Sequence, residues 1–136
     1  MLTVAEKYFG FHPDEKLVSL CQDAYDYIET TKLAKDNLFD IVIMDINYTE
    51  EDLHISPPWK FLTTEFLQKI ADGFLNQDCA YFCINVLYYS EEAKTKVHDC
   101  FKAVKNFHKL ALFEVEEGNN KVFVLSRNKL AVQGMH

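Results

Sequence analysis

The sequence predicts an α/β fold in which a mostly parallel sheet lies between two layers of helices and ends in an antiparallel hairpin. Segments of helical periodicity alternate with strand-like segments over most of the chain, which is typical of this three-layer arrangement. The last two strand-like segments, residues 109–115 and 121–126, are joined by Glu117-Gly118-Asn119-Asn120, whose Gly and Asn favour a tight hairpin. A length of 136 residues fits one domain, 1–136.

The composition is that of a globular protein, with 49% hydrophobic residues and a formal net charge of -7. No apolar run approaches the ~20 residues that a transmembrane helix needs, so we expect no membrane span. Non-specific nucleic-acid binding needs clustered Lys and Arg, so we expect no nucleic-acid partner. The acidity favours a cationic partner instead.

The first third of the chain predicts a helix, a short strand and a second helix. Residues 2–9 have helical periodicity, and Gly10 ends that helix. Residues 16–21 are strand-like. Asp23 suits the N-cap of the next helix, and Asp26 is favourable in its first turn.

The middle of the chain predicts two buried strands with a helix between them. Residues 39–45 form a nearly continuous apolar run that ends in Asp45, as expected of a parallel strand covered on both faces. A connection of about fifteen residues follows, and connections of that length are usually functional. A helix is expected at about 64–75 and a strand at 79–87. Ser90 then suits the N-cap of a helix whose inner face carries Val97, Phe101, Val104 and His108.

Ligands of such sheets bind at the carboxyl ends of the strands. This rule selects Asp23, the segment 45–48 and the segment 85–89 as candidate site regions.

The four cysteines, Cys21, Cys79, Cys83 and Cys100, have no C-x-x-C spacing and are interpreted as buried free thiols. We expect no metal site, because ligands at closer spacing would be needed. The lack of a disulfide framework favours an intracellular, cytoplasmic location.

Several stretches carry a family resemblance: Val4–Phe11, Gln22–Ile28 and Phe39–Asp45, then Ser56-Pro57-Pro58-Trp59 followed by Phe66–Ile70. Their order resembles the spermidine synthase-like branch of the class I S-adenosylmethionine-dependent methyltransferases, which have a Rossmann-like three-layer fold. Within that branch, the proline-rich stretch is similar to the lysine and N-terminal methyltransferases of translation elongation factor 1-alpha. The resemblance covers Met1 to about Lys129.

The chain also departs from that family. Members begin with a strand ending in a Gly-rich loop, whereas this chain has four glycines and no G-x-G. We therefore expect the first two strands, the Gly loop and the ribose-binding acid to be missing, with Met1 matching an internal position of the family pattern.

The resemblance implies a role for residues at two strand ends. Asp23 and Ala24 match the family's acid–small pair beside the cofactor adenine, although Asp23 alone is equally well explained as a helix cap. Asp45 matches the methionine end of S-adenosylmethionine, where a carboxylate could hold an amine of the cofactor or substrate; the alternative is a solvated strand end. Asn47 stands where the aminopropyl transferases of this branch have a second Asp, which acts as base.

The connection after Asp45 supplies the remaining candidates, which are assigned to the substrate: Tyr48, Pro58 and Trp59. Trp59 could pack over a substrate cation or hold the loop on the core. Glu50, Glu51 and Asp52 could attract a cationic amine or simply be solvated.

Together these features predict a methyltransferase domain that acts on a protein amine, with elongation factor 1-alpha as the suspected substrate. We expect the chain to be inactive alone because it lacks the Gly-rich loop. One alternative is a non-catalytic module that forms a homodimer, because the strand at 39–45 becomes an exposed edge without its neighbours. The other is an aminopropyl transferase relic, which Asn47 disfavours because an amide cannot take a proton.

Overall fold

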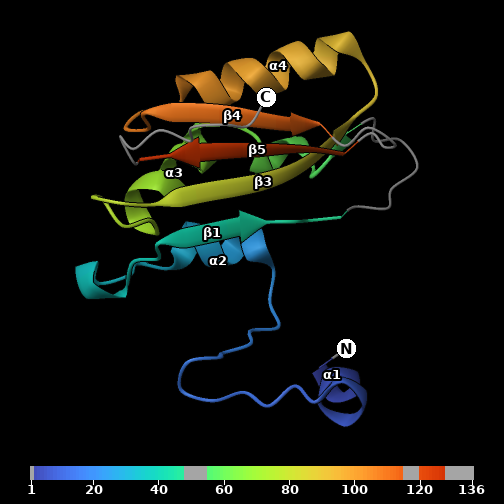
Figure 1. Cartoon of the computed structure of the whole chain (residues 1–136), viewed down its shortest axis with the longest axis vertical. Coiled ribbons are helices and arrows are strands. Elements are labelled where there is room, and N and C mark those ends of the chain that lie inside the picture. Colours follow the sequence, from blue (N-terminus) through green and yellow to red (C-terminus); the bar gives the residue numbers. More distant parts are fainter. Residues whose placement is uncertain (1, 48–54, 115–119, 128–136) are drawn as a thin grey trace. The chain divides into compact units, whose positions relative to one another are not determined.

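The computed structural model describes residues 2–47, 55–114 and 120–127 (Figure 1). The chain divides into two compact units, Met1–Thr30 and Thr31–His136. None of the described helices is long and apolar enough to cross a membrane.

The first unit contains two short helices, α1 (Leu2–Phe9) and α2 (Ala24–Thr30). The predicted end of α1 is confirmed, since Gly10 has φ +67°, which favours glycine. The predicted cap of α2 is also confirmed, because Asp23 Oδ1 accepts hydrogen bonds from the backbone N–H groups of Tyr25 and Asp26, at 2.7 and 3.0 Å. None of the described residues of this unit is buried.

The strand predicted at residues 16–21 is wrong. This segment has no regular secondary structure, and Asp14 Oδ1 instead accepts hydrogen bonds from the N–H groups of Lys16 and Leu17 in a turn. The apolar side chains of Leu17, Val18 and Leu20 are exposed by 48%, 70% and 61%. An apolar run forms a strand only where another strand pairs with it, and none does so among the described residues.

The second unit is built on a five-stranded sheet. Its strands are β1 (Ile41–Met44), β2 (Ile55–Ser56), β3 (Tyr81–Tyr88), β4 (Lys109–Glu114) and β5 (Asn120–Ser126). Four strands lie in the order β1-β3-β5-β4, and the short strand β2 also pairs with β3. β1 is parallel to β3, whereas β5 is antiparallel to both β3 and β4. β1, β3 and β4 therefore run in one direction, and β2 and β5 run against them. The predicted α/β sheet with a C-terminal antiparallel pair is confirmed, and β1 and β3 are its directly paired parallel strands.

The described part of the long connection after β1 contains regular secondary structure. This part contains β2, which pairs antiparallel with the end of β3, and a short 3-10 helix, Trp59–Phe61. Another 3-10 helix spans Lys35–Asn37.

Two helices cover one face of the sheet, α3 (Thr64–Gly73) and α4 (Glu91–Ala103) (Figure 1). Each begins at a hydroxyl N-cap: Thr63 accepts from Phe66 N–H at 3.3 Å, and Ser90 accepts from Ala93 N–H at 3.1 Å. The cap predicted at Ser90 is thus confirmed. His108, predicted on the inner face of this helix, is instead exposed and lies beyond its end.

The core lies between these helices and the sheet. Alternate residues of β3 are buried, so that Phe82, Ile84 and Val86 are completely inaccessible to solvent. Phe123 of β5 meets Phe101 of α4 with ring centroids 4.4 Å apart, which joins the sheet to the helix layer.

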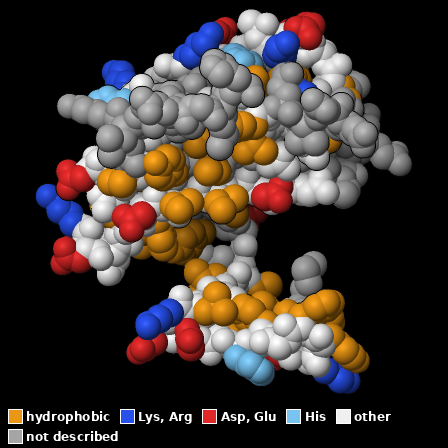
Figure 2. Space-filling model, in the orientation of Figure 1, with side chains coloured by type: hydrophobic (Ala, Val, Ile, Leu, Met, Phe, Trp, Pro, Cys, Tyr) orange, Lys and Arg blue, Asp and Glu red, His pale blue; other side chains and the backbone are white. Residues whose placement is uncertain are grey.

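Two apolar side chains of β1 are exposed, against the expectation that both faces of this strand are covered. Ile41 and Ile43 are exposed by 57% and 72%. β1 is also the last strand on its side of the described sheet. Figure 2 shows apolar side chains gathered on the visible surface of both units.

The four cysteines are free thiols, but the prediction that they are buried is wrong. Cys21 and Cys79 are exposed, and Cys83 and Cys100 are half-buried. Cys79 precedes β3, and Cys83 points to the sheet face opposite the core. Partial burial still raises the pKa of the Cys83 thiol, which keeps it protonated at neutral pH.

Candidate active site at the ends of strands β1 and β3

A hollow of about 390 Å³ opens where β1 and β3 end. Its lining comes from the segment after β1, from β2, from β3 and from the first residue of β5: Asp45, Ile46, Asn47, Ser56, Asn85, Leu87 and Asn120. The predicted site at the carboxyl ends of the parallel strands therefore coincides with a concave surface.

The register of the sheet explains why Asp45 and Asn85 meet. Met44 of β1 lies opposite Ile84 of β3, so that the next residues along both strands are neighbours. Asn85 Nδ2 donates a hydrogen bond to Asp45 Oδ1 at 3.0 Å. The carboxylate is thereby fixed by a side chain that lies 40 residues away in the sequence.

Two further contacts shape the opening of the hollow. Ser56 Oγ donates to the carbonyl oxygen of Ile46 at 3.0 Å, which ties β2 to the segment after β1. Asn120 lies opposite Leu87 in the ladder between β3 and β5, and this pairing brings the start of β5 to the hollow.

The lining carries a single carboxylate, Asp45, together with three amides and one hydroxyl. Amides both donate and accept hydrogen bonds, whereas an ionised carboxylate only accepts. No Lys, Arg or His is among the lining residues that the structure describes. Such a site suits a ligand with one positive charge and several N–H donors.

The predicted site residues are only partly brought together. Asp45 and Asn47 both line the hollow. Asp23 and Ala24 belong to the first unit, where the side chain of Asp23 caps α2, so their part in cofactor binding stays a prediction. Tyr48 and the acidic residues 50–52 lie outside the described residues.

Pro58 and Trp59 do not line this hollow. The ammonium group of Lys96 on α4 lies 4.1 Å from the centroid of the Trp59 ring. A cation from the protein itself therefore faces this indole, and the contact joins the connection after β1 to α4, as in the alternative interpretation of Trp59. A substrate contact by Pro58 or Trp59 stays a prediction.

Two lining residues were not among the sequence candidates: Ser56 and Asn120. Asn85 lies in the segment 85–89 that the strand-end rule selected, although no role was assigned to it. Asn120 was interpreted only as a turn residue. Its position became evident only from the pairing of β5 with β3.

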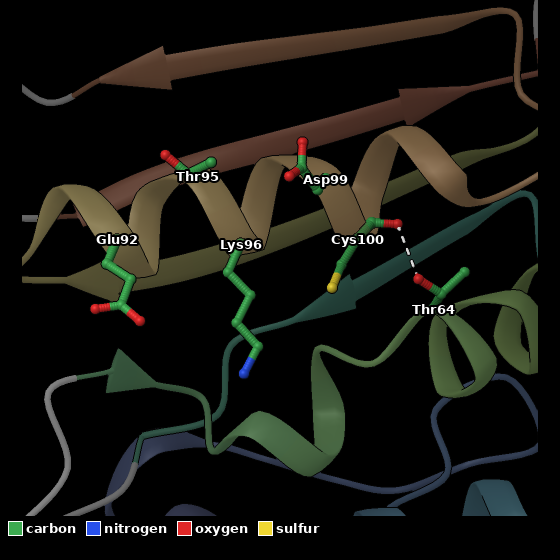
Figure 3. A pocket seen from close by; sticks show the side chains of 6 residues that line it. All are labelled: Thr64, Glu92, Thr95, Lys96, Asp99 and Cys100. Atoms are coloured by element: carbon green, nitrogen blue, oxygen red, sulfur yellow. Dashed lines mark hydrogen bonds between the residues drawn. The ribbon is translucent and has the colours of Figure 1, made fainter.

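A second hollow, of about 600 Å³, lies along α4 (Figure 3). Thr64 Oγ1 donates there to the carbonyl oxygen of Cys100 at 3.5 Å. Its charged lining residues are of both signs, and it shares no residue with the hollow at Asp45: Thr64, Glu92, Thr95, Lys96, Asp99 and Cys100. Within the described residues, no group of three or more His, Cys, Asp or Glu side chains is arranged to hold a metal ion.

Comparison with known proteins finds similarity to methyltransferases. No family model matches the chain. The chain is 28% identical over 134 residues to the eEF1A lysine and N-terminal methyltransferase homolog of Drosophila melanogaster, a match that covers 95% of this chain and 19% of that protein. It is 32% identical over 71 residues to the eEF1A lysine and N-terminal methyltransferase of Danio rerio, covering 52% of this chain and 10% of that protein.

A solved structure matches the fold of this chain over nearly the whole length of this chain. The crystal structure of human methyltransferase-like protein 13 in complex with SAH superimposes with a TM-score of 0.78 at 25% identity, covering 96% of this chain and 60% of that one. The chain resembles the eEF1A methyltransferases. It spans about a fifth or less of the length of these curated relatives and 60% of the methyltransferase-like protein 13 chain.

Proposed function

We propose that this chain forms part of an S-adenosylmethionine-dependent methyltransferase domain that acts on a protein amine. The observation that carries the proposal is the carboxylate–amide hollow at the ends of β1 and β3, in a fold that matches methyltransferase-like protein 13 in complex with SAH. SAH is the product that remains after S-adenosylmethionine has given up its methyl group.

The acceptor-rich lining fits either an amine substrate or the amine-bearing end of the cofactor. When bound, S-adenosylmethionine would supply an electrophilic methyl carbon. An uncharged amine would attack it, with SAH leaving as the C–S bond breaks and the amine proton passing to water. The protein then mainly has to hold the amine in line with that group. Asp45 accepts a hydrogen bond from the amine nitrogen, and the bond from Asn85 keeps the carboxylate oriented.

The names of the relatives and the charge of the chain support a protein substrate. Both curated relatives are named for eEF1A. The net charge of -7 favours a basic partner, and the lone carboxylate of the hollow favours binding of the amine in its cationic form, before it loses the proton and reacts. We propose eEF1A as the substrate and the cytoplasm, where translation takes place, as the location.

A chimera tests this function. The part of the human methyltransferase-like protein 13 chain that has no counterpart here is fused to this chain, and transfer of a labelled methyl group to eEF1A is measured. We expect transfer by the chimera and at least about a hundredfold loss for Asp45→Asn, since removal of one preorganised polar group costs about 10²–10³ in rate. A chimera that binds S-adenosylmethionine but methylates nothing contradicts the proposal. Thr95→Val, in the second hollow, is the matched control.

The chain alone should not bind the cofactor tightly. It contains no G-x-G sequence, and such loops let backbone N–H groups approach the cofactor. Isothermal titration of the 136-residue chain with S-adenosylmethionine checks this. A dissociation constant below about 10 µM, which corresponds to roughly 7 kcal/mol of binding free energy, would overturn the expectation.

A second, non-catalytic role is favoured by β1. Its Ile41 and Ile43 side chains are 57% and 72% exposed, and no described strand pairs with its outer edge. Such edges pair readily with other strands, and we propose a homodimer formed through β1. Sedimentation at several concentrations should show a dimer that Ile43→Lys returns to a monomer, while Thr95→Val does not. A wild-type chain that stays monomeric at high concentration excludes this role.

A further inference from the structure

We propose that Asn85 is an amine-recognition residue whose side-chain amide nitrogen orients Asp45 and whose amide oxygen accepts a hydrogen bond from the same bound amine. This inference rests on the proposed function in that it names the chemical class of ligand for the same hollow. It assigns to the site a preference for primary amines over amines that carry no N–H.

The backbone holds Asn85 in one place. It lies between Ile84 and Val86, both of which are completely buried in the core. In the sheet it is paired with Val122 of β5. Because side chains alternate along a strand, burial of its two neighbours forces the Asn85 side chain to the opposite face, toward the hollow.

The chemistry of Asp45 decides which end of the amide faces it. An ionised carboxylate can only accept hydrogen bonds, so the NH₂ group of Asn85 must be the donor in the 3.0 Å contact with Asp45 Oδ1. The amide oxygen is consequently turned away from the carboxylate and remains available as an acceptor.

That amide oxygen is buried and has no hydrogen-bond partner among the described residues. A buried polar atom without a partner lowers stability, because it loses its hydrogen bonds to water without replacement, and native proteins rarely leave one unexplained. Because the unsatisfied atom is an acceptor at the wall of a hollow, a ligand that brings an N–H donor relieves this cost on binding.

The two acceptors together define the ligand. Asp45 supplies a negative charge, and Asn85 Oδ1 supplies a neutral acceptor next to it. A primary ammonium or amine has enough N–H groups to reach both. A quaternary ammonium has the same charge but no N–H, so it satisfies Asp45 electrostatically and leaves the Asn85 oxygen unpaired.

The test compares two cations of matched chain length, n-butylammonium and n-butyltrimethylammonium, at neutral pH with the full 136-residue chain. The readout is the backbone amide resonances of Asn47 and Leu87, which line the hollow and are retained in every variant, together with the side-chain amide resonance of Asn85 in the wild-type chain. We expect n-butylammonium to shift these resonances with at least about tenfold higher affinity, equivalent to about 1.4 kcal/mol. Equal affinities for the two cations in the wild-type chain overturn the inference.

Variants separate recognition from folding. Asn85→Leu keeps the size of the side chain and should bring the affinity ratio close to one, whereas Asp45→Asn should weaken both cations together. Thr95→Val should change neither. Should Asn85→Leu fail to fold, Asn85→Ser gives the same comparison with a smaller side chain. A folded variant at position 85 that keeps the full preference contradicts the assignment.

The outcomes also distinguish this inference from the proposed function, because the binding measurement uses neither cofactor nor methyl transfer. An amine preference without methylation by the chimera refutes the methyltransferase proposal and leaves the recognition site intact. Methylation by the chimera together with equal binding of both cations refutes only the role of Asn85 and leaves the methyltransferase proposal intact.

Discussion

Arg127 is the one charged residue that is buried in the described part of the chain. It follows β5 and is only 4% exposed. Its guanidinium donates to the carbonyl oxygens of Ala71 and Asn76, at 2.6 and 3.3 Å, and to the side chain of Gln77. Burial lowers the pKa of Arg127, and Asp72, at 3.9 Å, partly offsets that effect. The residue thus joins the end of β5 to the turn between α3 and β3.

Replacing Arg127 by methionine should destabilise the protein by about 2–4 kcal/mol, because the buried carbonyl groups lose their donor. Urea unfolding followed by circular dichroism measures the change. Lys105→Met, at an exposed position, should cost less than about 0.5 kcal/mol. A loss for Arg127→Met no larger than for this control would show that the network contributes little.

Single residues also show what the sequence could reveal. Asp23 and Ser90 were predicted as caps because an Asp or Ser before a helical pattern satisfies free N–H groups, a purely local effect. The contact between Asp45 and Asn85 depends on which residues of β1 and β3 stand opposite each other. That register is a property of the assembled sheet. The positions of Asp45 and Asn85 at strand ends were therefore predictable, but the contact between them was not.

At the scale of elements, the apolar runs at 39–45 and 79–87 predicted β1 and β3, because two paired strands sustain each other. The run at 16–21 looked similar and is no strand. A β pattern shows only that a segment fits a sheet, whereas a helix makes its own hydrogen bonds. Isolated strands are therefore the elements most easily predicted in error.

The N-cap of α4 permits a sharp test of element stability. Ser90→Ala removes the acceptor of the Ala93 N–H and should cost about 1 kcal/mol, whereas Ser90→Gly should cost only a few tenths, about 0.3 kcal/mol. Chemical denaturation of the two variants compares them directly. A loss for Ser90→Ala below about 0.3 kcal/mol would mean that the hydroxyl contact does not stabilise α4.

At the scale of the whole molecule, the two units differ in whether they have a buried core. The second unit has a core under α3 and α4, whereas none of the described residues in the first is buried. Isolated helices shorter than about 12–15 residues are marginal in water, and α1 and α2 have 8 and 7 residues.

Hydrogen exchange should therefore separate the units. Backbone amides of α1 and α2 should exchange at least about a hundredfold faster than those of β3, because helices without buried contacts open with little free-energy cost. Mass spectrometry of peptic fragments measures both regions in one sample. Comparable protection in the two units would contradict this expectation.

The alternation along β3 has a consequence for protein engineering. Its even-numbered residues 82, 84 and 86 face the core, while Cys83, Asn85 and Leu87 lie on the opposite face. A combinatorial library confined to these odd-numbered positions would vary ligand preference while leaving the packed interior untouched. The same strand therefore offers two sets of positions that can be optimised separately, one for foldability and one for selectivity.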